Sequence, residues 1–354
     1  MKILLISYNV RRRGGIERLS LDVAAGLAAQ GHQVELLSTR RLGPGPLGRL
    51  LGQLWFLLRL ALASRRSELL WSMHALLLHQ VRPLLPAALP RICWLHGVEV
   101  WGSALAPLAP SLQRCRALAA SSNFTRERLL EQPGPWPKIE VVHPLACLWD
   151  GQHLPAALEH EQRELRLLTV ARLDSAERYK GHELLLQALV QLNANWRWQV
   201  IGSGNDLPRL QALSCSTGLA ERVDFVGSCT DAELRRAYGW CNLLAMPSSY
   251  YLRADASACG EGFGITYLEA ALAGRASLGC LQGGQTDLII NGQSGWLVEA
   301  NPAAVLAALQ AIAENPLQLA QRGAAARQRA QSCFGGELFQ AGLHNAFSIG
   351  LVGQ

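Results

Sequence analysis

The sequence has 354 residues, which is enough for two domains with separate hydrophobic cores. Apolar residues make up 49% and charged residues 17%, as in an ordinary globular α/β protein. The net charge of +6 suits an anionic substrate or an anionic membrane surface. The basic clusters, at residues 11–13, 40–41 and 65–66, are not interleaved with aromatic residues, which argues against a nucleic-acid groove.

Cysteine usage and hydropathy further restrict which class of protein the sequence can belong to. The nine cysteines include no Cys-x-x-Cys pair, which indicates a reducing compartment and argues against a disulfide scaffold or a zinc site. Arginines interrupt the N-terminus too early for a signal peptide. No uninterrupted apolar run reaches the ~20 residues of a membrane span. Residues 47–63 come nearest; with Arg49, Gln53 and Arg59 they fit either a helix lying on a membrane or an ordinary packed helix.

The first half of the chain alternates strands and helices. An apolar strand is expected at residues 2–7, and a loop with two glycines follows it. The next helix is predicted by apolar residues at helical spacing, namely Ile16, Leu19, Val23 and Leu27. With a strand at residues 33–37 this is a βαβ unit, which predicts a parallel sheet. Further strands are expected at residues 68–71, 91–95, 117–120 and 139–142.

The second half repeats this pattern after a weakly patterned linker at residues 144–164. Strands are expected at residues 165–170, 196–201, 223–226 and 243–246, and helices at residues 182–192, 207–217 and 231–240. The sequence therefore predicts an α/β protein of two Rossmann-like, doubly wound domains, with ligands at the carboxyl ends of the strands and the active site in the cleft between the halves.

Residues 261–273, Glu-Gly-Phe-Gly-Ile-Thr-Tyr-Leu-Glu-Ala-Ala-Leu-Ala, are the most informative segment of the chain. A glycine-rich turn that opens a helix leaves backbone N–H groups free to hold an anion. Glu261 would lie in the turn and Glu269 on the helix, so one carboxylate can bind sugar hydroxyls and the other ribose hydroxyls. A capped helix with an exposed glutamate is the alternative explanation.

This segment resembles the signature of retaining glycosyltransferases of the GT-B fold, family 4, and the resemblance extends over nearly the whole chain. It implies that an N-terminal domain (residues 1–155) binds the acceptor and a C-terminal domain (residues 160–333) binds a nucleotide-sugar, with residues 334–354 packing back on the first domain. The segment Gly262-Phe263-Gly264 and Glu269 would then contact the donor, and Glu261 would act in catalysis.

The same resemblance assigns other positions. Arg172 and Lys180 would neutralise the diphosphate as its bond to the sugar breaks, with Arg178 as a rival to Lys180 because the gap is wider than usual in the family. His96 would contact the donor sugar or the acceptor. Gly14 and Gly15 would form the glycine loop of the N-terminal domain.

Two further positions of the donor site follow from the resemblance, and three segments depart from the family. Gly202 would form a turn in the donor domain, and Val226 would lie beside the nucleotide base. His143-Pro144 replaces the usual Pro-Asn-Gly turn, Asp287 stands near the place of a family glutamate, and residues 249–260 form an insertion that is either a lid or a surface excursion.

The expected function is transfer of a sugar from a nucleotide-diphosphate-sugar to a hydroxyl of a glycan or lipid-linked acceptor, with retention of anomeric configuration, in the synthesis of cell-surface polysaccharide or glycolipid. We expect no cofactor and no catalytic metal, because the chain contains no Asp-x-Asp. The expected location is the cytoplasm, either free or in peripheral contact with the inner face of the cytoplasmic membrane through the basic N-terminal domain. A non-catalytic nucleotide-sugar binder is the alternative. A dehydrogenase is disfavoured because the third glycine of the dinucleotide fingerprint is missing after Gly204.

Overall fold

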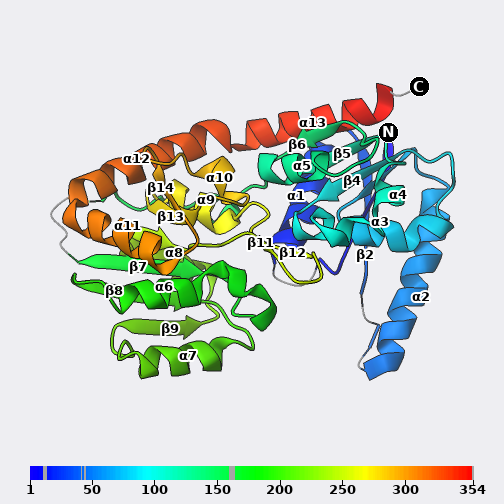
Figure 1. Ribbon diagram of the computed structural model, residues 1–354. Helices are drawn as coiled ribbons and strands as arrows, with labels where there is room; N and C mark the ends of the chain where they lie inside the picture. The colour runs from blue at the N-terminus through cyan, green and yellow to red at the C-terminus, as the bar shows by residue number, and fades with distance from the viewer. Residues whose placement is uncertain (11–13, 41, 44, 159–163, 353–354) are drawn as a thin grey trace. The chain divides into compact units, whose positions relative to one another are not determined.

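The computed structural model describes residues 1–10, 14–40, 42–43, 45–158 and 164–352. The basic residues 11–13 and 41, and residues 159–163 of the expected linker, lie outside the described residues. The chain divides into two compact units (Figure 1). Unit 1 contains residues 1–145, 254–258 and 336–354, and unit 2 contains residues 146–253 and 259–335.

Unit 1 is built on a sheet of six parallel strands in the order β2-β1-β3-β4-β5-β6. The central strands are apolar runs that are buried on both faces, as is typical of a parallel sheet covered by helices. The strands are β1 (Lys2–Ser7), β2 (Gln33–Ser38), β3 (Leu69–Ser72), β4 (Arg91–Leu95), β5 (Ala117–Ala120) and β6 (Ile139–Val141). Each agrees with a predicted strand to within one residue at either end.

Helices cover this sheet and complete its core. The helix α1 (Gly15–Ala29) buries the predicted residues Leu19, Val23 and Leu27, and the last helix, α13 (Gly336–Val352), adds Phe339 and Leu343 to the same cluster. The remaining helices are α2 (Gly45–Ser64), α3 (Ala75–Val81), α4 (Ala109–Leu112) and α5 (Asn123–Leu130), with 3-10 turns η1 (Arg82–Leu84), η2 (Val98–Val100) and η3 (Ser103–Leu105).

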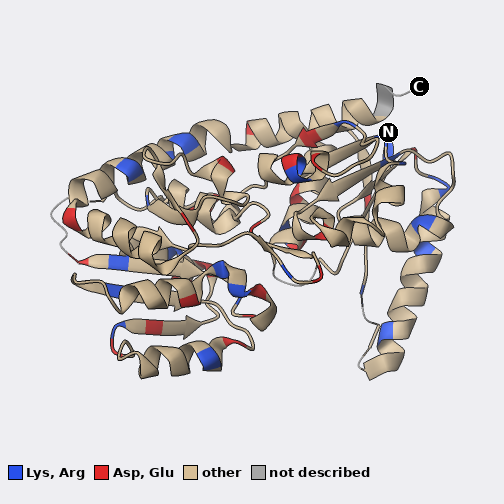
Figure 2. Ribbon diagram, viewed as in Figure 1, with Lys and Arg blue, Asp and Glu red and all other residues tan. Residues whose placement is uncertain are grey.

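The helix α2 differs from its neighbours in what its faces contact. One face is buried, with Gly52, Phe56 and Leu60. The opposite face carries exposed leucines. Arginines but no acidic residues occur along the helix (Figure 2).

Unit 2 contains a second sheet of six parallel strands in the order β14-β13-β10-β7-β8-β9. Its strands are β7 (Leu165–Val170), β8 (Trp196–Ile201), β9 (Val223–Gly227), β10 (Leu243–Ala245), β13 (Ala276–Cys280) and β14 (Gly295–Val298). Its helices are α6 (His182–Leu189), α7 (Leu207–Ser216), α8 (Asp231–Trp240), α9 (Ile265–Leu272), α10 (Gln285–Leu288), α11 (Pro302–Glu314) and α12 (Pro316–Cys333), with 3-10 turns η4 (Cys147–Trp149) and η5 (Ser175–Lys180).

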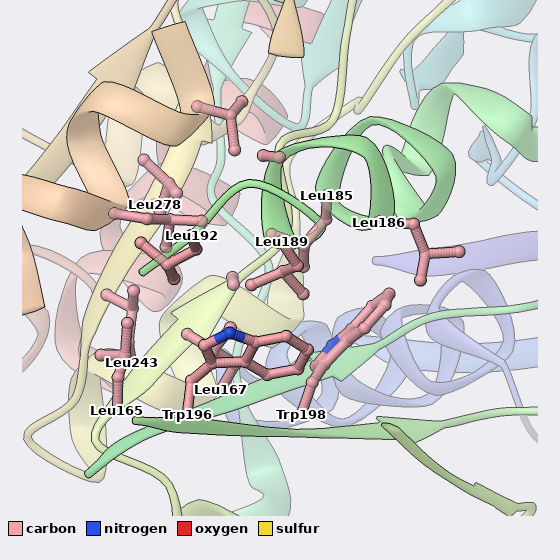
Figure 3. Packing of buried hydrophobic residues seen from close by; sticks show 14 of the residues in the cluster. Leu165, Leu167, Leu185, Leu186, Leu189, Leu192, Trp196, Trp198, Leu243 and Leu278 are labelled. Carbon is pink, nitrogen blue, oxygen red and sulfur yellow. The ribbon is translucent and has the colours of Figure 1, made fainter. Parts of the chain in front are cut away.

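Two tryptophans on β8 anchor the core of unit 2. Trp196 and Trp198 pack beneath the leucines of α6 (Figure 3). The indole N–H of Trp198 donates to Thr169 Oγ1 at 2.9 Å, and the Thr169 hydroxyl donates to the backbone oxygen of Ala245 at 2.5 Å. This relay satisfies the indole N–H of Trp198 and the hydroxyl of Thr169, and it links β8, β7 and β10.

The two Rossmann-like units confirm the predicted fold class, whereas the cleft between them stays a prediction. The boundary of the first unit differs from the expected residue 155, because residues from 146 onward fold with unit 2. Trp149 is the reason: its ring lies 6.2 Å from that of Tyr238, and its indole N–H donates to the backbone oxygen of Glu269 at 3.0 Å. The insertion at residues 249–260 carries the short strands β11 (Tyr251–Leu252) and β12 (Ala258–Cys259).

Candidate functional site

The strand order of unit 2 reverses between β7 and β10, which creates a switch point at the carboxyl edge of the sheet. The chain leaves β7 in one direction to form β8 and later returns to place β10 on the other side. In open α/β sheets, ligands bind outside the carboxyl ends of the strands at such a switch point. Residues 171–181 follow β7, and residues 246–264 follow β10.

An ion pair joins these two segments. Lys180, the last residue of η5, donates from Nζ to Glu261 Oε2 at 2.5 Å. Both side chains are only slightly exposed, at 13% and 11%. Burial lowers the pKa of Lys180, but Glu261 and Tyr179 raise it more, so the lysine pKa lies above its usual value. Lys180 therefore stays a cation at the switch point.

Backbone geometry holds this pair in place. Gly181 has φ +84°, and a Cβ there would lie 2.3 Å from the oxygen of Pro247, so only glycine fits next to Lys180. The N–H of Ser249 donates to the oxygen of Tyr179 at 2.8 Å, and the N–H of Gly284 donates to the oxygen of Glu261 at 2.7 Å. The loop of Lys180 is thereby tied to the chain that follows β10.

The predicted turn at residues 262–264 opens α9 as expected. Gly264 caps the helix with φ +91°, and a Cβ there would lie 2.5 Å from the ring of Tyr267 and 3.2 Å from Cγ of Glu261. The Phe263 side chain is buried and lies 6.1 Å from the ring of Phe334. The side chain of Phe263 is therefore part of the core, and a contact of this residue with a ligand would involve its backbone.

Glu269 lies on α9, and its carboxylate is held by a buried tyrosine. Tyr238 on α8 donates its hydroxyl to Glu269 Oε2 at 2.8 Å. Burial raises the pKa of Glu269 more than the hydrogen bond from Tyr238 lowers it, and the resulting pKa is about 7. Burial and the charge of Glu269 raise the pKa of Tyr238 well above its usual value, so the phenol remains a donor. The protonation state of Glu269 therefore changes near neutral pH.

The two arginines of the expected diphosphate site are placed differently from Lys180. Arg172 is 77% exposed and forms an ion pair with Glu177. Arg178 is half exposed, and its guanidinium donates to Asp206 at 3.1 Å. Arg209 also donates to Asp206, at 2.8 Å from both Nε and Nη2, which draws this carboxylate toward α7. Of the predicted cations Arg172, Arg178 and Lys180, Lys180 is the one that the structure pairs with Glu261.

The remaining predicted positions of unit 2 lie on the same carboxyl edge. Gly202 directly follows β8, and a Cβ there would lie 1.8 Å from the oxygen of Ala171, so the turn requires glycine. Val226 lies on β9 and is 42% exposed. Its exposed side chain leaves an apolar surface next to that turn.

Unit 1 has its own switch point, between β1 and β3, and three ring side chains gather there. Tyr8 follows β1, His74 follows β3 and His96 follows β4, on three adjacent strands. The ring of Tyr8 lies 5.2 Å from that of His74, edge to face, and the rings of His74 and His96 are 5.7 Å apart.

Hydrogen bonds to the backbone fix how the two histidines present their nitrogens. His96 Nε2 lies 2.6 Å from the oxygen of Met73, which can only accept, so Nε2 carries the proton. In neutral His96, Nδ1 is therefore an acceptor. The N–H of Leu76 donates to His74 Nδ1 at 3.1 Å, so neutral His74 carries its proton on Nε2. Burial lowers the pKa of His74, with a smaller opposing effect of Glu99, which favours this neutral form.

The glycine loop of unit 1 lies at the same sheet edge, because it follows β1. Gly14 caps α1 with an extended backbone, φ −172°, and no side chain caps the helix. Gly15 is the first helical residue. The N-terminal N–H groups of α1 therefore face the same edge as Tyr8.

Sequence reasoning named Lys180, Glu261, Glu269 and His96, whose roles stay predictions, and did not name Tyr8, His74 or Tyr238, which the structure places beside some of them. A usable signal existed for His74, because it follows its strand as His96 follows β4. None existed for Tyr238, which is one tyrosine within an ordinary amphipathic helix. Within the described ranges, no three His, Cys, Asp or Glu side chains gather as a metal site.

Comparison with known families identifies the architecture. A model described as glycosyl transferases group 1 matches residues 152–329, half of the chain. The chain belongs to the glycosyl transferases group 1. A second model, glycosyltransferase family 4, matches residues 13–145, so the two models divide the chain near the boundary between the units. The resemblance drawn from residues 261–273 is confirmed.

Individual relatives are distant. The GDP-mannose-dependent alpha-(1-6)-phosphatidylinositol monomannoside mannosyltransferase of Mycolicibacterium smegmatis is 26% identical over 243 residues, which is 66% of this chain. The match spans 63% of that relative, less than two thirds of its length. Sucrose-phosphate synthase from Thermosynechococcus elongatus has a TM-score of 0.78 at 20% identity, covering 98% of both chains. Anabaena Alr3699/HepE, solved with UDP and glucose, has a TM-score of 0.76 at 19% identity, covering 98% of this chain and 99% of the other. These two structures confirm the GT-B fold.

Proposed function

We propose that this protein transfers a glycosyl unit from a nucleotide-diphosphate-sugar to an acceptor hydroxyl with retention of anomeric configuration. The observation that carries the proposal is the ion pair of Lys180 and Glu261 at the switch point of unit 2, within the segment that the group 1 model matches. A cation suits the diphosphate and a carboxylate suits sugar hydroxyls, so the pair marks where the sugar–phosphate bond would lie.

In the proposed reaction the bond between the anomeric carbon and the diphosphate oxygen breaks. The acceptor oxygen forms the new bond to that carbon on the same face, and its proton goes to the departing phosphate oxygen. Lys180, with Arg172, would neutralise the charge that develops on the diphosphate. Glu261 would hold sugar hydroxyls, Glu269 the ribose, and the backbone of residues 262–264 a phosphate oxygen. Gly202 and Val226 would line the nucleotide.

On the acceptor side, we infer that His74 and His96 bind one hydroxyl group or a pair of neighbouring ones. His74 offers one N–H donor and neutral His96 offers one acceptor nitrogen, and a hydroxyl both donates and accepts. The glycine loop at Gly14 and Gly15 would close on the donor or acceptor. The relative named above acts on a phosphatidylinositol mannoside by its name, which supports a hydroxyl-rich, lipid-linked or glycan acceptor here.

A test of the acceptor site compares His74→Phe with the wild type. The ring is kept but the N–H donor is lost, so we expect KM for the acceptor to rise about tenfold, as for loss of one hydrogen bond. Slow hydrolysis of the donor in water, measured without acceptor, should be unchanged. An equal loss in both reactions would place His74 outside the acceptor site.

We further propose synthesis of a cell-surface polysaccharide or glycolipid in the cytoplasm, with unit 1 in peripheral contact with the inner face of the membrane. The net charge of +6 supports contact with an anionic surface.

The decisive experiment screens a panel of nucleotide-sugars, including GDP-mannose and UDP-glucose, by thermal shift and then by release of nucleoside diphosphate with candidate acceptors. A donor that stabilises the protein and is turned over supports the transferase. Stabilisation by a donor with neither transfer nor hydrolysis would favour the non-catalytic binder. Stabilisation by nicotinamide dinucleotides alone would contradict both.

A further inference from the structure

The exposed face of α2 is the most unusual surface of unit 1. Seven leucines lie on it at helical spacing, with exposures between 37% and 66%: Leu47, Leu50, Leu51, Leu54, Leu57, Leu58 and Leu62. We call them the leucine face. At 100° per residue they occupy about 140° of the helix circumference, opposite the buried residues Gly52, Phe56 and Leu60. A face of this size without a partner in the described chain marks an interaction site.

The charges on α2 and on the segments that flank it in sequence have one sign. Between Glu35 and Glu68 the described residues include five arginines, at positions 40, 49, 59, 65 and 66, and no acidic residue. Figure 2 shows the helix with basic but no acidic segments. Arg59 donates to Glu35 at 2.6 Å, which leaves the cluster strongly positive. The helix and the segments that flank it in sequence therefore carry positive charge, which complements an anionic partner.

An aromatic side chain lies at the border between the apolar and basic parts. The guanidinium of Arg40 lies 3.6 Å from the ring centre of Trp55, and that of Arg59 lies 5.7 Å from it. Tryptophan and arginine together are suited to the headgroup level of a bilayer, where the ring is half desolvated and the cation meets phosphate.

We propose that the leucine face docks unit 1 on an anionic phospholipid bilayer, with α2 lying in the interface. Among the described helices α2 is the one long and apolar enough to cross a membrane, with a mean hydropathy of 1.2 over 18 residues. Crossing is disfavoured because Arg49 and Arg59 would enter the hydrocarbon and because the face with Phe56 packs on unit 1. A symmetric dimer through this face would bring two arginine clusters together, so a second copy is disfavoured by charge.

This inference specifies the membrane contact of the proposed function, but its test does not depend on glycosyl transfer. The full-length protein is floated with vesicles of phosphatidylcholine, with or without phosphatidylglycerol, at low and high salt. We expect binding to the anionic vesicles, at least about tenfold weaker binding to neutral ones, and weakening by salt.

The key variant is the triple substitution Leu50→Gln, Leu54→Gln and Leu58→Gln. Because the three leucines are exposed, we expect the variant to keep its fold. An unchanged midpoint of thermal unfolding would verify this. We expect its partition into anionic vesicles to fall about a hundredfold. The matched control, Leu84→Gln, Leu130→Gln and Leu338→Gln, changes exposed leucines elsewhere in unit 1 and should bind as the wild type does.

The outcomes distinguish a phospholipid bilayer from a second copy of the chain as the partner of the leucine face. Equal vesicle binding by the α2 variant and the wild type would overturn the proposal. Failure of the wild type to bind vesicles, together with a dimer that the α2 variant abolishes, would replace the membrane by a second copy. Turnover of a water-soluble acceptor, measured in parallel, should be the same in all three proteins. Loss of membrane binding with turnover intact would support the docking surface, while absent turnover with intact binding would reject the enzyme and leave the surface standing.

Discussion

Lys180 and Glu261 are 81 positions apart, yet their contact defines the candidate donor site. The two residues stabilise each other. The Glu261 carboxylate keeps Lys180 charged, and Lys180 offsets the cost of placing a carboxylate where little water reaches it. A bound donor would place its diphosphate against Lys180 and its sugar hydroxyls against Glu261. Without a donor, Lys180 and Glu261 would pair with each other. A bound donor would replace this ion pair by one contact from Lys180 to the diphosphate and one from Glu261 to the sugar.

The first prediction compares the two cations on η5. Lys180→Ala should reduce turnover about a hundredfold or more, because it removes a charge contact to the leaving diphosphate. Arg178→Ala should change turnover by less than about threefold, because Arg178 is half exposed and paired with Asp206. Steady-state kinetics with the donor found in the panel would measure both. The reverse ranking would move the diphosphate site to Arg178.

The second prediction concerns Glu269. With a pKa of about 7, about a tenth of its carboxyl groups are ionised at pH 6 and about nine tenths at pH 8. If the ionised form binds the ribose hydroxyls, affinity for the nucleoside diphosphate should rise roughly tenfold between these pH values. Glu269→Gln should lose this rise and bind about ten- to a hundredfold more weakly at pH 8.

Calorimetry with the free nucleoside diphosphate would test this, since that ligand has the ribose but no sugar. Titration of the ligand's own phosphate also contributes to the pH profile, so the comparison with Glu269→Gln isolates the protein group. Glu261→Gln is the matched control and should keep diphosphate affinity while losing turnover. Equal losses of diphosphate affinity in the two variants would refute the assignment of sugar to one carboxylate and ribose to the other.

At the scale of elements, α9 depends on the residue that begins it. Gly264 adopts φ +91° so that the chain can turn from Glu261 into the helix, and Tyr267 packs where a Cβ would be. The helix then carries Glu269 to Tyr238. One glycine therefore positions both carboxylates.

The third prediction follows from this arrangement. Gly264→Ala should lower the free energy of unfolding by more than the about 1–2 kcal/mol of a left-handed alanine, because the methyl group also meets Tyr267. It should also reduce turnover, since Glu261 lies beside the new methyl group. Gly218→Ala, with φ +74° and open space around it, should show the backbone strain alone and keep full turnover. Chemical denaturation and steady-state kinetics would measure the free energy of unfolding and the turnover of both variants. Equal losses in Gly264→Ala and Gly218→Ala would contradict the proposed role of the turn.

At the scale of the whole molecule, the fold was more predictable than the site. The strands of both sheets are short apolar runs such as residues 2–7, whose pattern needs no knowledge of the rest of the chain. The ion pair of Lys180 with Glu261 and the meeting of Tyr8, His74 and His96 depend on strand order, which brings distant segments to one sheet edge. Local sequence patterns do not show which distant residues meet at a sheet edge. Only the family motif indicated some of these residues.

The fourth prediction also concerns the whole chain. Activity should survive an excess of chelator, because the sequence lacks Asp-x-Asp and no cluster of three metal-ligating side chains occurs in the described part. Lys180 and Arg172 would supply the positive charge instead. Loss of turnover in chelator, with recovery on adding magnesium or manganese, would mean that a cation holds the diphosphate.

The position of α13 in unit 1 sets the order in which the two units can mature on the ribosome. The core of unit 1 needs Phe339, Leu343 and Phe347, yet 190 residues separate Leu145 from Gly336. At the usual pace of translation these residues take roughly 10–40 s to synthesise. Unit 2 can fold during that interval, while the first sheet waits with apolar strands uncovered. Unit 1 is thus the last unit to complete its core. Nascent chains that stall before residue 336 should therefore expose its sheet to chaperones and proteases.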